Sequence, residues 1–473
     1  MPDQRPIILW FRRDLRLSDH AALTAAVATG RPIIPLFIND PVLQGQGAAP
    51  RFRMGLAIAA FGQSLAKRGS QLILRQGDAL EVLQELIAET GADTVYWSRL
   101  YDVTAKARDT AVKAALKAAG VAARSFQGHL LFEPWTVQTK TGGFYKVYTP
   151  MWKAVRDTDV APSLPPVSHI PAPESWPASD CLDDWQLGAD MRRGARVLQP
   201  HCVVGETAAQ DRLARFIAER VGRYQTNRDL PAERGASGLS ENLTYGEISP
   251  RQCWHAGRAA MHRGQSDAEV FLKELVWREF AYHLSHHTPR IETGNWKPDW
   301  DTFPWNTDEN TPEVLAWKQG RTGVPFVDAA MRELYVTGIM HNRGRMIVAS
   351  YLTKHLLSHW QIGLKWFADC LIDWDPASNA MGWQWSAGSG PDATPYFRVF
   401  NPETQIDKFD KDRRYAKRWI AEGYATPTPT ALSYFDAVPE SWALSLDVPY
   451  PQAIVSAAEG RKRALDAYAA RGF

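Results

Sequence analysis

Residues 6–11, Pro-Ile-Ile-Leu-Trp-Phe, form a short apolar run that predicts a buried first strand. Similar runs recur through the first 130 residues, and longer amphipathic stretches separate them. The predicted strands are Pro6–Phe11, Arg31–Ile38, Gln71–Arg75, Asp93–Trp97 and Ala122–Phe126, and the predicted helices are Arg51–Arg68, Ala79–Thr90 and Ala105–Ala119. This alternation indicates an α/β fold with a doubly wound, parallel, Rossmann-like sheet.

The pattern changes to successive helices from about residue 205, and no convincing strand follows. These helices include Thr207–Val221, Asp267–Leu284, Val324–Thr337 and Arg343–Leu357. Residues 161–200 contain seven prolines and little periodicity, which is typical of an interdomain connector. We therefore predict an α/β domain over residues 1–130, a connector over 131–204 and an all-helical domain over 205–473.

The composition is that of a globular protein, with 45% apolar and 22% charged residues in a chain of 473. No apolar run approaches the ~20 residues that span a bilayer, and no signal-peptide core follows the N-terminus, so we expect a cytoplasmic monomer. The four cysteines are scattered without a CxxC pair, so we predict no metal site. Because 54 Lys and Arg face 52 Asp and Glu, a nucleic-acid site must be a local basic patch.

One predicted helix, Asp267–Leu284, carries two different faces. Leu272, Leu275, Val276 and Phe280 belong to an apolar stripe, whereas a second face holds Phe271, Glu274, Trp277 and Arg278. A solvated salt-bridge face is one interpretation of the second set. A Trp beside charges also marks binding surfaces, and the sequence leaves both interpretations open.

Two further segments have patterns that suit phosphate. The helix that begins at His341 has arginines 343 and 345 in its first turn, against the helix dipole. Either a bound phosphate or a nearby carboxylate would balance them. The Gly-rich loop 235–240 suits a diphosphate cradle, and it equally suits an ordinary turn.

Residues 373–385 read Asp-Trp-Asp-Pro-Ala-Ser-Asn-Ala-Met-Gly-Trp-Gln-Trp and combine two acids, an amide and three indoles. A core helix would not bury these polar groups without partners. A metal site would need a third ligand, and none has suitable spacing. The segment therefore favours a stacking surface beside a polar pocket.

Several ordered motifs resemble those of the photolyase/cryptochrome family along essentially the whole chain. They are Trp10–Arg16, Glu274–Phe280, Met340–Arg343, Gly382–Trp385 and Arg398–Pro402. The resemblance is greatest to class I-type cyclobutane pyrimidine dimer photolyases. It implies a lyase in which blue light drives an electron from reduced FAD into pyrimidine dimers of UV-damaged DNA.

The resemblance also implies which residues hold FAD in the helical domain. Asn379 matches the position that faces flavin N5, where a neutral amide suits the reduced flavin of repair enzymes. The other implied FAD contacts are Tyr224, Ser237, Gly238, Leu239, Ser240, Phe271, Arg278, Asn342, Arg345, Asp373 and Asp375. Ala236 and Gly238 depart from the Thr and Arg that are usual in this loop, so one hydroxyl contact is lost.

A flipped dimer would lie against an acid, an amide and two indoles, since indoles replace lost base stacking. The implied lesion and DNA contacts are Glu274, Trp277, Arg278, Asn342, Arg343, Met346, Trp385, Arg398 and Gln405. Glu274, Asn342 and Asn379 are the implied catalytic side chains. A chain of indoles that photoreduces FAD is implied as Trp383, Trp360 and a distal Trp305, whose local spacing departs from the common pattern.

A second, antenna chromophore is less clearly indicated. Thr104-Ala105 replaces the Asn-Glu pair of folate-binding members, so a deazaflavin, a flavin, a folate or none remains open. The main alternative function is a cryptochrome-type blue-light photoreceptor, which Asn379 and the intact lesion residues disfavour. An NAD(P)H-dependent flavin oxidoreductase is disfavoured because no GxGxxG follows the first strand.

Overall fold

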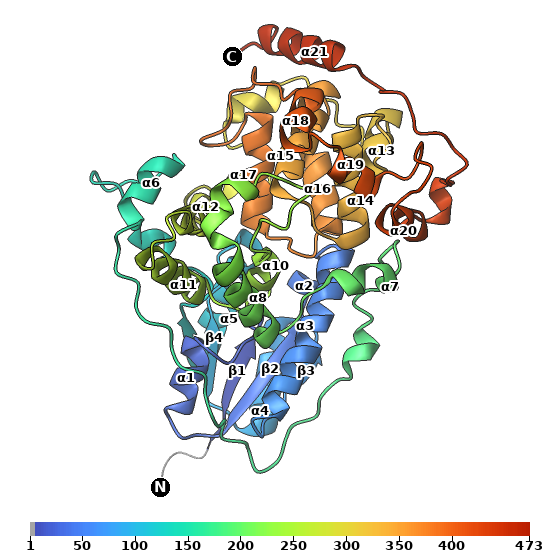
Figure 1. The fold of residues 1–473 in the computed structure, drawn as a ribbon. Coiled ribbons are helices and arrows are strands. Elements are labelled where there is room, and N and C mark those ends of the chain that lie inside the picture. The colour runs from blue at the N-terminus through green and yellow to red at the C-terminus, as the bar shows by residue number, and fades with distance from the viewer. Residues whose placement is uncertain (1–4) are drawn as a thin grey trace.

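The computed structural model describes residues 5–473, and an α/β layer packs there beneath a larger helical body (Figure 1). Within that range five strands form one parallel sheet: β1 (Ile7–Phe11), β2 (Ile33–Asn39), β3 (Ile73–Gln76), β4 (Thr94–Ser98) and β5 (Ala122–Phe126). Their order is β3-β2-β1-β4-β5, with Ile7 opposite Ile33 on one side and Thr94 on the other. The order reverses between β1 and β4, whose carboxyl ends form the topological switch point.

Helices cover both faces of the sheet because successive side chains of a strand point to opposite sides. Leu9 and its odd-numbered neighbours in β1 pack with α1 (Ala21–Val27) and α3 (Ala48–Ala66). Trp10 and Ile8 pack on the other face with α4 (Ala79–Thr90) and α5 (Val103–Ala118). A short helix, α2 (Pro41–Gln44), follows β2. The predicted doubly wound α/β fold is confirmed.

The connector is partly helical and is anchored to the helical body. It contains α6 (Tyr148–Val155) and α7 (Ala195–Leu198). The buried guanidinium of Arg193 donates hydrogen bonds of 2.5–2.8 Å to the carbonyl oxygens of Leu334, Tyr335 and Cys370. These carbonyls lie in the last turns of α14 and α16, where intrahelical donors run out, although the Leu334 carbonyl also accepts the Gly338 N–H at 2.9 Å. The exact division of the chain at residues 130 and 204 stays a prediction.

The remainder of the chain is helical. Its α-helices are α8 (Glu206–Glu219), α9 (Tyr224–Asn227), α10 (Ser240–Thr244), α11 (Pro250–His262), α12 (Ala268–His287), α13 (Pro312–Lys318), α14 (Pro325–Thr337), α15 (Asn342–Ser350), α16 (Trp360–Cys370), α17 (Pro376–Ala387), α18 (Pro402–Phe409), α19 (Arg414–Trp419), α20 (Pro429–Ala437) and α21 (Ala457–Ala469). The single helix predicted over Arg343–Leu357 is wrong in its second half. A π-helical turn, Tyr351–His355, follows α15, and Leu357 leaves it with a positive φ.

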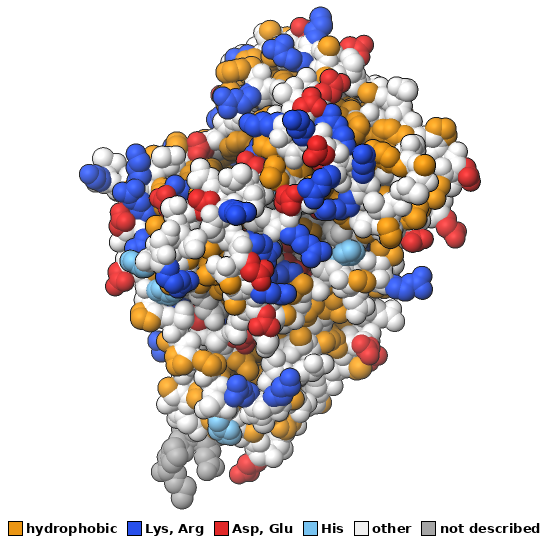
Figure 2. Space-filling view, viewed as in Figure 1, with side chains coloured by type: hydrophobic (Ala, Val, Ile, Leu, Met, Phe, Trp, Pro, Cys, Tyr) orange, Lys and Arg blue, Asp and Glu red, His pale blue; other side chains and the backbone are white. Residues whose placement is uncertain are grey.

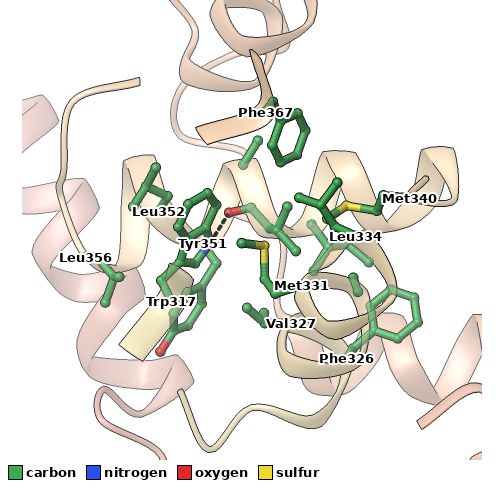
Figure 3. Packing of buried hydrophobic residues seen from close by; sticks show 14 of the residues in the cluster. Trp317, Phe326, Val327, Met331, Leu334, Met340, Tyr351, Leu352, Leu356 and Phe367 are labelled. Atoms are coloured by element: carbon green, nitrogen blue, oxygen red, sulfur yellow. Dashed lines mark hydrogen bonds between the residues drawn. The ribbon is translucent and has the colours of Figure 1, made fainter. Parts of the chain in front are cut away.

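The largest core lies among α13, α14, α15 and α16. Figure 3 shows Val327, Met331 and Leu334 of α14 packed beside Trp317 and Tyr351. The indole of Trp317 donates a 3.1 Å hydrogen bond to the Val348 carbonyl, which satisfies the only polar atom that this side chain buries. This core fixes the helices that carry the candidate site.

Buried charges join the α/β layer to the helical body. The Arg53 guanidinium of α3 contacts the carboxylates of Glu241 and Glu247 at 2.5 and 2.7 Å, and all three residues are fully buried. Removing one partner of such a group leaves an uncompensated charge, so the pairing holds the two layers in one register. No helix among residues 5–473 is both long and apolar enough to cross a membrane.

Candidate functional site

Helix α17 organises the segment 373–385. It begins where the Asp375 carboxylate accepts the Ser378 backbone N–H at 2.9 Å and Pro376 occupies the first turn. The other Asp375 oxygen accepts a hydrogen bond from the Tyr282 hydroxyl and lies 3.4 Å from Arg13. These groups hold the pKa of the buried Asp375 below its usual value despite desolvation. Both oxygens therefore have protein partners, and a flavin contact for Asp375 stays a prediction.

Arg345 and Asp373 form a second pair, beside α17. One guanidinium nitrogen of Arg345 lies 2.8 and 3.0 Å from the two Asp373 oxygens, and its Nε donates to the Met340 carbonyl. Asn379 follows one turn into α17 and donates its amide N–H to the Leu364 carbonyl at 3.1 Å. That bond leaves the Asn379 side-chain oxygen as a free acceptor.

The predicted second face of α12 is occupied by ordered contacts. Glu274 pairs with Arg228 at 2.8 Å, and burial raises the pKa of Glu274 while Arg228 opposes the shift. Trp277 stacks on Tyr148 of the connector with ring centroids 3.7 Å apart and planes 5° apart. One face of the Trp277 indole is therefore covered by the protein.

Phe271 and Tyr224 contribute to packing below this face. Both are buried, and their rings meet edge to face at 6.2 Å with Phe216 between them. Burial raises the pKa of the Tyr224 hydroxyl, so it stays a neutral hydrogen-bonding group. A contact of either residue with FAD stays a prediction.

Arg278 has partners in the segment that precedes the connector. Its guanidinium donates to the His129 carbonyl at 2.8 Å and lies 2.9 Å from the His129 ring, just before the connector. Glu279, its neighbour, is buried and accepts the backbone N–H groups of Leu131 and Phe132. These contacts join α12 to the start of the connector. A contact of Arg278 with FAD or with the lesion stays a prediction.

The N-terminus of α15 carries a histidine cap and two paired arginines. His341 caps the helix by accepting the Arg343 N–H at 3.1 Å, and burial lowers the pKa of His341 to about 4. Arg343 pairs with Asp229 at 2.6 Å, as Arg345 pairs with Asp373. Carboxylates therefore pair with both arginines in this structure, and a phosphate at this N-terminus stays a prediction. Beside them the exposed Asn342 points its amide toward the Met346 sulfur at 3.9 Å.

The loop 235–240 is tightly built. Gly238 has a φ of +72°, which favours glycine, and its carbonyl accepts a hydrogen bond from Arg212. A side chain at Gly235 would collide with the Asn227 carbonyl at 2.3 Å. The Ser237 hydroxyl accepts the N–H of the buried Leu239, and Ser240 begins α10. The loop thus has a fixed backbone, as a diphosphate cradle requires.

The indoles predicted to carry electrons are buried. Trp360 donates to the Asn295 side chain at 2.8 Å, whereas Trp383 has a buried N–H without a partner among the described residues. Gly363 lies one turn after Trp360, and a Cβ there would come within 2.0 Å of the Trp383 ring. Gly363 is therefore required for Trp383 to lie against the helix that carries Trp360.

Trp305 is only 6% exposed, although a distal donor would be expected at the surface. Its ring lies 5.5 Å from Trp300 and 4.6 Å from Phe303, measured between ring centroids. Tyr396 lies on these two rings in turn, at 5.4 and 4.9 Å. His359 lies between the two predicted donors, 5.5 Å from Trp360 and 5.4 Å from Trp305. The role of Trp305 stays a prediction.

The predicted DNA contacts after α17 lie on or near the surface. Trp385 and Gln405 are half-buried, and Arg398 is exposed on the loop between α17 and α18. The Arg398 carbonyl accepts a hydrogen bond from the buried Lys354, whose pKa burial lowers to about 7. Phe397 beside it is 56% exposed, and sequence reasoning missed this residue because an isolated Phe resembles core.

The donor set fits FAD in the helical domain. A free amide oxygen, a guanidinium paired to an acid and a rigid glycine loop match the polar needs of a flavin and a diphosphate. The buried, unpartnered N–H groups of Trp374 and Trp383 show that polar capacity remains unused in this region. A surface hollow of about 680 Å³ between α8 and α11 is lined by residues such as Leu213 and Ala256, and none of its lining residues belongs to this set.

Sequence reasoning missed the residues that position the site. Arg228, Asp229, Tyr148 and Gly363 each contact a predicted site residue from a distant part of the chain or a neighbouring helix. No local pattern identifies such partners, because each looks like an ordinary surface, connector or helix residue.

Comparisons with known proteins cover almost the whole chain. Residues 7–173 match the family model for DNA photolyase, and residues 271–470 match the FAD binding domain of DNA photolyase. A deoxyribodipyrimidine photo-lyase of Agrobacterium fabrum is 46% identical over 98% of both chains. Cryptochrome-1 of Arabidopsis thaliana is 34% identical over 96% of this chain and 69% of its own length.

The structural comparison concerns the expected subclass. The crystal structure of a bacterial class III photolyase from Agrobacterium tumefaciens superposes with a TM-score of 0.90 and 45% identity, and covers 99% of this chain and 98% of the other. The structure matched at this level of similarity is a class III photolyase, whereas a class I-type one was expected. Sequence, fold and site agree that this chain belongs to the photolyase/cryptochrome family.

Proposed function

We propose that this protein is a deoxyribodipyrimidine photolyase, a lyase that splits cyclobutane pyrimidine dimers in UV-damaged DNA under blue light. The observation that carries the proposal is the neutral amide of Asn379, which donates one N–H to the Leu364 carbonyl and keeps its oxygen as a free acceptor. Bound FAD supplies the light-driven electron when it is reduced. An amide oxygen accepts a hydrogen bond from a protonated partner and cannot itself supply a proton.

The lesion residues support the same assignment. Arg228 holds one carboxyl oxygen of Glu274 at 2.8 Å, so the second oxygen is available to hydrogen-bond the dimer. Trp277 is held flat by Tyr148, and Trp385 lies on α17, so both indoles can replace stacking that a flipped dimer loses. Asn342 and Met346 supply the third side. We define Glu274, Trp277, Asn342, Met346 and Trp385 as the proposed lesion pocket.

We assign the FAD contacts to the residues that the family resemblance implied, with the strongest support for Asn379, Arg345, Asp373 and the loop 235–240. We also propose a cytoplasmic monomer that binds DNA through this face. A second chromophore at the switch point of the sheet would need rearrangement. There Arg12 and Arg108 lie 4.2 and 4.8 Å from the Trp10 ring and pair with Asp109 and Asp40.

The test is repair of UV-irradiated oligo-dT by the reduced holoprotein under blue light, followed by chromatography of the thymines. Restored thymine supports the proposal. Unchanged dimers with FAD bound and reduced would contradict it and favour the photoreceptor alternative. Glu274→Gln should lower repair while FAD content stays constant, and equal losses of both would show that Glu274 is structural.

A further inference from the structure

Two adjacent residues after α9 pair with the two helices that carry most of the proposed lesion pocket. Arg228 lies 2.8 Å from Glu274 on α12, and Asp229 lies 2.6 Å from Arg343 on α15. One dipeptide thus neutralises an acid on one helix and a base on the other. Neither pair was foreseen from the sequence.

The Arg343 guanidinium is held in place and remains near the surface. It lies 4.2 Å from the Phe409 ring centroid, and its Nε is buried without a partner among the described residues. The side chains of Arg343 and Asp229 are 16% and 37% exposed. Their pair is therefore partly hydrated and can be exchanged for another anion at a modest free-energy cost.

Basic side chains on the surrounding surface are also paired with acids. Figure 2 shows Lys and Arg side chains gathered over the region of α18 and α19 and interrupted by acids. Arg414 pairs there with Glu233 at 2.6 Å, and Arg413 pairs with Asp407. With a net charge of only +2, the chain balances much of its potential DNA surface internally.

We propose that Asp229 is a specificity-determining residue that holds Arg343 away from the DNA backbone until a flipped lesion brings a phosphate to the pocket. This inference rests on the proposed function. Non-specific DNA binding comes from phosphate contacts, so neutralising a surface arginine weakens it. A flipped dimer draws its backbone toward the pocket, and a phosphate is a strong bidentate partner for arginine. Undamaged DNA keeps its backbone in the duplex path, so the ion pair between Asp229 and Arg343 stays closed.

The experiment measures binding of the holoprotein to duplexes of oligo-dA with irradiated or unirradiated oligo-dT, by fluorescence anisotropy across a salt series. Asp229→Asn should raise affinity for unirradiated DNA about two- to fivefold, since the exposed pair is worth up to about 1 kcal/mol. Its salt slope should steepen by about one phosphate contact. Affinity for irradiated DNA should rise less, so the preference for damage falls. Asp229→Ser should act in the same way, because charge and not shape is at issue.

Asp436→Asn is the matched control, since it removes one exposed acid from α20 and should leave the preference unchanged. Introducing Asp229→Asn into an Arg343→Ala background tests whether Asp229 affects DNA binding through Arg343. A much smaller gain there shows that Asp229 acts through Arg343, whereas an undiminished gain would overturn the inference by showing general repulsion. An equal rise for both DNAs, or none, would also overturn it.

FAD absorbance and melting temperature report whether each variant is folded, and Asp229→Ser serves if Asp229→Asn does not fold. A wild-type protein that shows no preference for irradiated DNA would contradict the proposed function itself. A wild-type preference that the Asp229 variants retain would contradict only this inference.

Discussion

Replacing Trp383 by Phe would test whether this indole is the first electron donor to the flavin. The side chain is 2% exposed and lies against Phe367 at 4.9 Å and Trp317 at 6.1 Å. Its N–H has no partner among the described residues, so the change removes packing without orphaning a hydrogen bond. Loss of part of a buried ring lowers the free energy of unfolding by about 1–2 kcal/mol. A folded protein with a free energy of unfolding of about 5–15 kcal/mol tolerates that loss.

The expected variant therefore retains FAD and melts slightly earlier, but its oxidised flavin is no longer photoreduced. The assay follows flavin absorbance under blue light with a thiol donor, and chemical reduction beforehand should restore dimer repair. Trp254→Phe is the matched control, because Trp254 is equally buried but packs with Trp152 and Phe132 in another core. Photoreduction of the Trp383→Phe variant at the wild-type rate would refute the assignment.

Three further changes test other parts of the structure. Arg193→Met should lower the free energy of unfolding, measured in urea, by about 3 kcal/mol or more, because three carbonyls each lose the guanidinium donor. The control is Arg192→Met at an exposed site, which should change the free energy of unfolding by less than about 0.5 kcal/mol. Burial raises the pKa of Glu279 from 4.5 to about 7. The folded protein therefore binds this proton more tightly than the unfolded chain does, and the resulting stabilisation is complete below pH 4.5 and is lost as pH rises to 7. As pH rises from 4.5 to 8, the free energy of unfolding of Glu279→Gln should therefore increase by about 3 kcal/mol relative to that of the wild type, measured in melting experiments. If the two proteins lose stability in parallel over this pH range, the pKa shift is contradicted. Arg345→Lys should lower the FAD retained after gel filtration, since lysine cannot reproduce the guanidinium contacts with Asp373 and Met340, and full retention would show that this geometry is dispensable.

The sheet was predictable because its signals are local. The central strands β1 and β2 are compact apolar runs, and Gly91 ends α4 in the left-handed conformation where the helical pattern stops. The π-helical turn Tyr351–His355 was not predictable, since it continues the periodicity of α15 for one more turn. Its course depends on contact with α21, more than 100 residues later in the chain, as the contact of Gly460 with His355 shows.

The candidate site was predictable in residue type but not in partners. Segment 373–385 indicated acids that need partners, and the structure provides Arg345 for Asp373 and Arg13 with Tyr282 for Asp375. Arg13 comes from the N-terminal signature, so the two strongest motifs of the sequence meet in space. Nothing in either motif alone reveals this meeting, because it depends on how the two layers pack.

The pairing of site charges has a consequence for how DNA binds. Arg343 and Arg228 each hold a carboxylate, so a phosphate must replace an existing partner and cannot simply neutralise a free cation. Exchange releases fewer ions than addition, because the carboxylate that is set free takes up a cation in place of the one that the DNA phosphate releases. The salt slope of wild-type binding should therefore be smaller than the number of arginines near the pocket indicates. A slope that equals that number would mean that these pairs are open in solution, and the selectivity attributed to Asp229 would then lack its physical basis.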